Sequence, residues 1–144
     1  MRRRLAAYLA AREDAGIMLV GEAPGYRGAR ISGVPFTSER QLTGTGPAEA
    51  TATIVRRVLA ELELEEDVLC WNVVPTHPGT ATSNRRPSRA EVDSGRRFLE
   101  RLARGRRVIA VGRLAERATG ASYVRHPSHG GATAFRETLR ACLS

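Results

Sequence analysis

The stretch Ile17-Met18-Leu19-Val20-Gly21-Glu22-Ala23-Pro24-Gly25 decides the fold of this chain. Its first four residues are all apolar, and a glycine follows them at once. A short apolar run of this kind is typical of a strand that is buried on both faces. The glycine-rich segment that follows continues to about residue 47, and a loop of that length in a compact domain is usually functional. We therefore expect a buried strand that leads into a functional loop.

Further apolar runs of the same kind alternate with helical patterns along the chain. Strands are expected at residues 17–20, 68–71, 108–111 and 122–124, and helices at residues 3–14, 48–64, 88–103, 114–118 and 132–143. Ser88 and Glu91 form a capping box at the start of the third helix. This alternation predicts a three-layer α/β/α fold with a four-stranded parallel sheet. We expect a single domain over residues 1–144.

Polar motifs follow three of the predicted strands. The segment 21–25 comes after the first strand, Asn72 after the second and His126 after the fourth. The carboxyl ends of parallel strands lie at one edge of a sheet, and ligands of such sheets bind beyond that edge. The sequence therefore predicts one site there.

The charge of the chain is strongly positive. Its 23 basic residues are all arginine, against 15 acidic residues, which gives a net charge of +8. A GC-rich genome would explain the use of arginine in place of lysine, but the excess of charge favours an acidic partner. Arginine pairs with phosphate through two parallel hydrogen bonds and stacks on bases, so nucleic acid is the natural candidate.

Several classes of protein do not fit this sequence. Cys70 and Cys142 form neither a CxxC pair nor a zinc or iron–sulfur spacing, so we expect no metal and no cofactor. No apolar stretch is long enough to span a membrane, and the apolar run after the first arginines is too short for a signal peptide. We expect a monomer in the cytoplasm.

Six motifs occur in a fixed order between residue 17 and about residue 135. They are LVGEAPG, GVPF, WNVVP, NRRPS, VIAVGRLA and RHPS. In this order, and at the ends of the expected strands, the set resembles the uracil-DNA glycosylase superfamily and is most similar to its family 4 branch. The resemblance implies a uracil-DNA glycosylase-like fold and an enzyme that flips a damaged base out of DNA and hydrolyses its bond to the sugar.

The resemblance also implies roles for individual residues. Phe36 matches the aromatic that stacks under the flipped base, Asn72 the residue that reads its edge, and His126 the histidine that stabilises negative charge on the leaving base. Glu22 is expected to contact the base or order the loop. The remaining substrate-binding residues implied are Gly21, Ala23, Pro24, Gly25 and Ser128.

The chain departs from the family pattern at several places. It lacks the four cysteines that hold an iron–sulfur cluster in family 4, Gly28 stands where those relatives have a second acidic residue, and Ala23 stands where another branch has the aspartate that activates water. Glu22 and Glu39 remain as candidates for placing water. After the HPS motif, His129-Gly130-Gly131 replaces the bulky residue that wedges into the duplex.

These observations favour a monofunctional glycosylase that acts on uracil or another deaminated base. Without lysine, only the N-terminal amine is available to form a Schiff base, so water is the expected nucleophile. The missing wedge predicts a preference for single-stranded or mismatched DNA. One alternative is a glycosylase-like DNA-binding module with little or no catalysis. Another is a branch that traps the base-free sugar on its own histidine, which ranks last because only Arg125 precedes that residue where such relatives have a basic insert.

Overall fold

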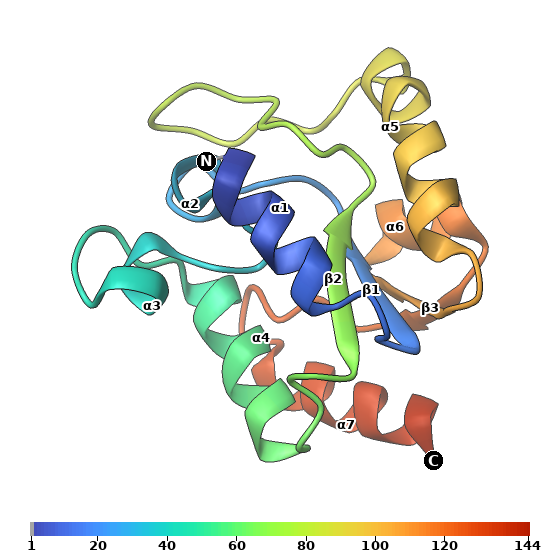
Figure 1. The fold of residues 1–144 in the computed structure, drawn as a ribbon. Coiled ribbons are helices and arrows are strands. Elements are labelled where there is room, and N and C mark those ends of the chain that lie inside the picture. The colour runs from blue at the N-terminus through green and yellow to red at the C-terminus, as the bar shows by residue number, and fades with distance from the viewer. Residues whose placement is uncertain (1) are drawn as a thin grey trace.

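A parallel sheet forms the centre of the molecule. The computed structural model describes residues 2–144. Its strands are β1 (Ile17–Gly21), β2 (Val68–Asn72), β3 (Arg107–Val111) and β4 (Ser122–Val124), arranged in the order β2-β1-β3-β4 (Figure 1). All neighbouring pairs are parallel, with Gly21 of β1 opposite Asn72 of β2. The predicted α/β fold with a four-stranded parallel sheet is confirmed.

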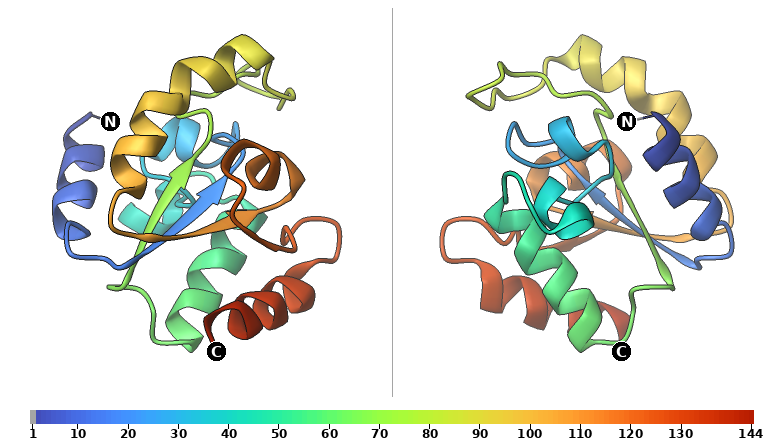
Figure 2. Two further views of the ribbon diagram at one scale, coloured as in Figure 1. Left: turned by 90° about the vertical axis from the view of Figure 1, so that its right-hand side faces the viewer. Right: turned by 60° about the vertical axis from the view of Figure 1, so that its left-hand side comes forward.

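Helices cover both faces of this sheet, because successive side chains of each buried strand point to opposite sides. Helices α4 (Ala50–Glu61) and α7 (Ala132–Leu143) pack on one face, whereas α1 (Arg2–Ala11), α5 (Arg89–Ala103) and α6 (Arg113–Thr119) pack on the other (Figure 2). Leu19 points toward the first group, and its neighbours Met18 and Val20 point toward the second. The result is the three-layer arrangement that the strand and helix pattern predicts.

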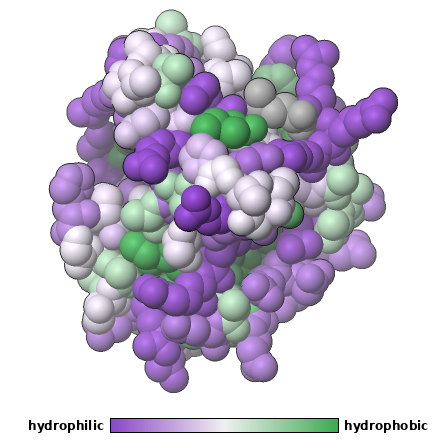
Figure 3. Space-filling view, turned by 90° about the vertical axis from the view of Figure 1, so that its left-hand side faces the viewer, coloured by the Kyte–Doolittle hydropathy of each residue, from purple (hydrophilic) through white to green (hydrophobic). Residues whose placement is uncertain are grey.

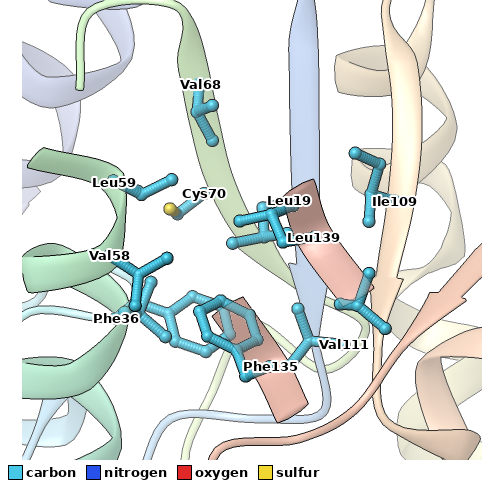
Figure 4. Packing of buried hydrophobic residues seen from close by; sticks show 12 residues of the cluster. Leu19, Phe36, Val58, Leu59, Val68, Cys70, Ile109, Val111, Phe135 and Leu139 are labelled. Carbon is cyan, nitrogen blue, oxygen red and sulfur yellow. The ribbon is translucent and has the colours of Figure 1, made fainter. Parts of the chain in front are cut away.

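The core on the side of α4 and α7 extends to the functional edge of the sheet. Phe135 and Leu139 of α7 and Val58 and Leu59 of α4 enclose the strand residues, and the ring of Phe36 lies among them (Figure 4). The packing of this core therefore fixes the position of an aromatic residue that the sequence assigns to the site.

The segment expected as a loop up to residue 47 contains two short helices. They are α2 (Ala29–Ser32) and α3 (Glu39–Thr43), and each ends at a glycine in the left-handed conformation. Helices this short give no periodic pattern, so the sequence does not reveal them. Buried hydroxyl groups hold the segment together, since Ser32 Oγ donates to the Thr37 carbonyl at 2.6 Å.

Most other element ends agree with the sequence to within a few residues. The first helix ends at Ala11 and α4 runs from Ala50 to Glu61, so both are shorter than expected. The capping box at α5 is confirmed: the N–H of Glu91 donates to Ser88 Oγ at 3.2 Å, and the N–H of Ser88 donates to the Glu91 carboxylate at 2.7 Å.

The side of the molecule that carries α2 and α3 has a mostly hydrophilic surface. Hydrophobic residues are seen there only in isolated patches (Figure 3). None of the helices within residues 2–144 is long and apolar enough to span a membrane.

Candidate active site

A cleft of about 400 Å³ lies beyond the carboxyl ends of β1, β2 and β4. Residues implied by the sequence line it together, namely Glu22, Ala23, Pro24, Gly25, Phe36, Asn72, His126 and Ser128. They come from segments far apart in the chain, and the parallel sheet brings them to one edge. Gly21 lies beneath the cleft, at the end of β1.

Gly21, Phe36 and Asn72 form one tightly packed unit. A Cβ atom on Gly21 would lie 2.4 Å from the ring of Phe36 and 2.8 Å from Oδ1 of Asn72. Both distances are well below a normal contact, so only glycine fits at this position. The close approach of strand and ring fixes the relative position of the two side chains above it.

Phe36 belongs both to the core and to the cleft. The residue is 9% exposed and packs in the cluster with Phe135 and Val58. Its backbone lies in the left-handed region, with φ of 51°. Arg56 holds this conformation, because its guanidinium donates hydrogen bonds to the carbonyls of Pro35 and Phe36, each at 3.1 Å. Phe36 therefore packs in the core and lines the cleft at the same time.

Asn72 is almost fully buried, and its side chain lines the cleft. The residue is 4% exposed, and no side chain or backbone group within residues 2–144 forms a hydrogen bond with its amide. Buried amides are nearly always hydrogen-bonded, so an amide that faces a cleft without a protein partner is available to a ligand.

The hydrogen bonds of His126 fix its tautomer. The backbone N–H of Ser128 donates to His126 Nδ1 at 3.1 Å, and Ser128 Oγ lies 2.8 Å from the same nitrogen. Nδ1 is therefore an acceptor, and the hydrogen of the neutral ring is on Nε2. Burial lowers the pKa of His126, and the nearby charges of Arg125 and His129 lower it further. The cleft thus holds a neutral imidazole with a free N–H donor.

The segment after His126 turns sharply and is small. His129 has φ of 52° and Gly130 has φ of 75°. His129 is exposed, and it is the one residue of the segment 129–131 that lines the cleft. Gly131 is buried, and a Cβ there would lie 2.2 Å from the carbonyl oxygen of His126.

The carboxylates that the sequence suggests for placing water differ in position. Glu22 lines the cleft but is exposed, and although partial burial raises its pKa, the charges of Arg86 and Arg117 oppose that shift. Glu39 is not among the residues that line the cleft. It forms two hydrogen bonds with Arg4, at 2.6 and 2.9 Å, and hydrogen bonding to this guanidinium lowers the pKa of Glu39.

Sequence reasoning missed residues that line the cleft. Glu49 and Tyr26 are the most prominent of these. Glu49 precedes α4 and lies in the segment expected to be helical, and no motif marks it. Its proximity to Gly25 and Gly28 is visible only in three dimensions.

His77 joins the two loops that border the cleft. Its Nδ1 lies 2.7 Å from the carbonyl oxygen of Pro24, and its Nε2 lies 2.7 Å from that of Thr80. His77 therefore occupies a bridging position between the loops at 24–25 and 77–84.

No metal site is formed within residues 2–144, where no three histidine, cysteine or acidic side chains group together as ligands. Cys70 is buried, Cys142 is partly buried, and both are free thiols.

Comparisons with known proteins agree with this arrangement. A family model described as "Uracil DNA glycosylase superfamily" matches residues 9–141. Among solved structures, the chain is similar to SMUG2 of Pedobacter heparinus, with a TM-score of 0.68 and 13% sequence identity over 96% of this chain and 79% of that chain. At this identity the likeness shows the fold alone. A search of curated proteins gives no match.

Proposed function

Because the chain belongs to the uracil DNA glycosylase superfamily, we propose that it is a monofunctional glycosylase that removes uracil or another deaminated base from DNA. The reaction breaks the bond between N1 of uracil and C1′ of the sugar, and water supplies the new oxygen on C1′. Within the superfamily, the order of motifs is most similar to the family 4 branch, without its cluster cysteines.

The observation that carries the proposal is that Asn72 and His126 line the same cleft. The Asn72 amide has both a donor and an acceptor free, which matches O4 and N3–H of uracil. Cytosine presents the opposite pattern at these positions and is rejected. Phe36 supplies a flat apolar surface on which the flipped base stacks.

His126 stabilises the leaving group. As the glycosidic bond breaks, negative charge grows on the base, and the Nε2–H of a neutral imidazole donates a hydrogen bond to O2. The hydrogen bond that the backbone N–H of Ser128 donates to Nδ1 keeps the ring in the tautomer that this requires. Ser128 and the backbone N–H groups of the segment 22–25, in which only Pro24 lacks one, contact the phosphates beside the flipped nucleotide.

The test is excision from a labelled oligonucleotide that carries one uracil, hypoxanthine or xanthine. Enzyme is used in excess over DNA, and abasic sites are then cleaved with alkali. We expect cleavage at the position of the modified base. The double variant Asn72→Ala/His126→Ala, purified in the same way, controls for contaminating glycosylases. DNA binding without a cleaved product on any of the substrates would show instead a glycosylase-like binding module.

A further inference from the structure

The carboxylate of Glu49 enters the cleft through a gap left by two glycines. A Cβ atom on Gly25 would lie 1.8 Å from Oε2 of Glu49, and one on Gly28 would lie 2.8 Å from its Cδ. Any side chain pointing that way at either position would occupy the space of the carboxylate. The glycines of the segment 22–28 therefore accommodate an acidic side chain from a different part of the chain.

The backbone of Glu49 is held in place. Its N–H donates to Ser38 Oγ at 2.8 Å, and its carbonyl accepts the N–H of Thr53 at 3.0 Å in the first turn of α4. Since the residue is anchored at the start of a helix that packs on the core, the side chain extends from a fixed point.

The carboxylate itself has no hydrogen-bond partner among residues 2–144, although the residue is only partly exposed. Burial raises its pKa, and the nearby charge of His77 opposes that shift. A partly buried carboxylate normally accepts hydrogen bonds, so in this cleft its partner comes from solvent or from the substrate.

The other acidic candidates are less suited to act on water. Glu39 is already paired with Arg4, and Glu22 is exposed. A general base gains strength from a raised pKa and must be free to accept a proton. Glu49 combines both properties with a place in the cleft that contains Asn72 and His126.

We propose that Glu49 is a catalytic residue that binds the attacking water and takes a proton from it. This inference rests on the proposed glycosylase function. The bond between C1′ and the water oxygen forms as the bond between C1′ and the base nitrogen breaks. The electron pair of the broken bond stays on the base, where His126 stabilises it, and the proton of the water moves to Glu49. That proton then passes to the released base through solvent.

The mechanism predicts an acidic limb in the pH profile of the cleavage step. Glu49 must be ionised to accept a proton, so the rate falls as pH drops through its pKa, which lies above the ordinary value of 4.5. The other titratable or charged groups that face the same space are Glu22, Tyr26, Arg27, His77, Arg85, His126 and His129.

The experiment measures single-turnover excision of uracil from single-stranded DNA between pH 4.5 and 8. It compares wild type with Glu49→Gln, Glu49→Ala and the control Glu39→Gln. We expect Glu49→Gln to lose at least about a hundredfold in rate, in the range of other acid–base side chains, and to lose the acidic limb. DNA affinity should stay within about threefold, while Glu39→Gln keeps the wild-type profile. Sodium formate should restore part of the rate of Glu49→Ala, because a small carboxylate fits the space that the mutation leaves.

Two results separate the possible failures. If wild type cleaves none of the modified substrates, the proposed function fails and the role of Glu49 fails with it. If wild type is active, the role of Glu49 alone is overturned in either of two cases. One is a Glu49→Gln variant as fast as wild type. The other is a slow variant that keeps the acidic limb, together with a Glu49→Ala variant that formate does not rescue.

Discussion

The backbone N–H of Ser128 donates a hydrogen bond to Nδ1 of His126, at 3.1 Å. Because a backbone N–H can only donate, the acceptor nitrogen carries no hydrogen, and the neutral ring must present Nε2–H to the cleft. Pro127, which is buried, separates the two residues and restricts the turn that brings them together. The sequence His-Pro-Ser therefore determines the protonation state of one atom in the candidate site.

Replacing His126 by alanine removes the donor to the leaving base. By analogy with the loss of one oxyanion-hole donor, we expect single-turnover excision to slow by about 10²–10³-fold, with DNA binding unchanged. His129→Ala, assayed on single-stranded DNA, is the matched control, because His129 is an exposed neighbour of the same type. A His126→Ala enzyme with the wild-type rate would remove this residue from the site.

The protonation of His126 also affects stability. Its pKa in the folded protein lies below the ordinary value of 6.5, so the unfolded chain binds more protons at pH values around and below 6.5. The contribution of His126 to the free energy of unfolding therefore has its full value above pH 6.5. It decreases as the pH falls toward the pKa of the folded protein. Urea unfolding of wild type and His126→Gln between pH 4.5 and 8 measures the effect. A difference between the two proteins that does not change with pH would contradict it.

Replacing Asn72 by aspartate removes the donor to O4 and places a carboxylate opposite it. A bidentate base contact is worth about 1–3 kcal/mol of discrimination. We expect uracil excision to fall at least about tenfold, with DNA affinity nearly unchanged since base contacts contribute little to it. Single-turnover rates and binding isotherms on the same oligonucleotide check this. Full activity in Asn72→Asp would show that another group reads the base.

Adding one methyl group at Gly21 should disturb Phe36 and Asn72 together. Overpacking of this kind costs about 1–3 kcal/mol, so Gly21→Ala should lower the free energy of unfolding by that amount. The excision rate should fall by more than the loss of folded protein explains, because both displaced side chains belong to the proposed site. Gly16→Ala is the control, since a Cβ at Gly16 has no atom within 4 Å. Similar behaviour of the two variants would argue against the close packing at Gly21.

The segment 129–131 predicts which form of DNA is attacked. Opening a base pair costs a few kcal/mol, and relatives offset part of this with a side chain inserted into the vacated space. Here two glycines follow His129, so we expect faster excision from single-stranded or mismatched DNA than from a U·A pair. Binding should weaken steeply with salt in each case, because arginine contacts to phosphate release counterions. The test measures the excision rate of one oligonucleotide at fixed salt in three forms: as a single strand, with G opposite the uracil, and with A opposite the uracil. An equal or faster rate on U·A would show that another residue opens the pair.

The sequence predicted the sheet and the position of the site because both depend on local patterns. Each buried strand is a short apolar run with a polar or glycine residue after it, and parallel pairing places those ends together. Gly21, Asn72 and His126 were therefore found at one edge from their position relative to the strands alone.

The sequence does not predict contacts between segments that are far apart in the chain. Glu49 has no motif, and its meaning comes from the space above Gly25 and Gly28. In the sequence, Gly28 stands where relatives have a second acidic residue. In the structure, the carboxylate of Glu49 lies 2.8 Å from where a Cβ of Gly28 would be. The sequence leaves Glu39 as a candidate for placing water, but it is paired with Arg4, which is distant in sequence, and it does not line the cleft.

The left-handed backbone at Phe36 restricts how this site can evolve. Residues branched at Cβ are strongly disfavoured at positive φ, so mutation of Phe36 to valine, isoleucine or threonine carries a conformational penalty that tyrosine, histidine or leucine does not add. A lineage that acquires a new base preference through this position is therefore confined to unbranched side chains. Relaxing that limit requires a prior change in the loop that Arg56 holds.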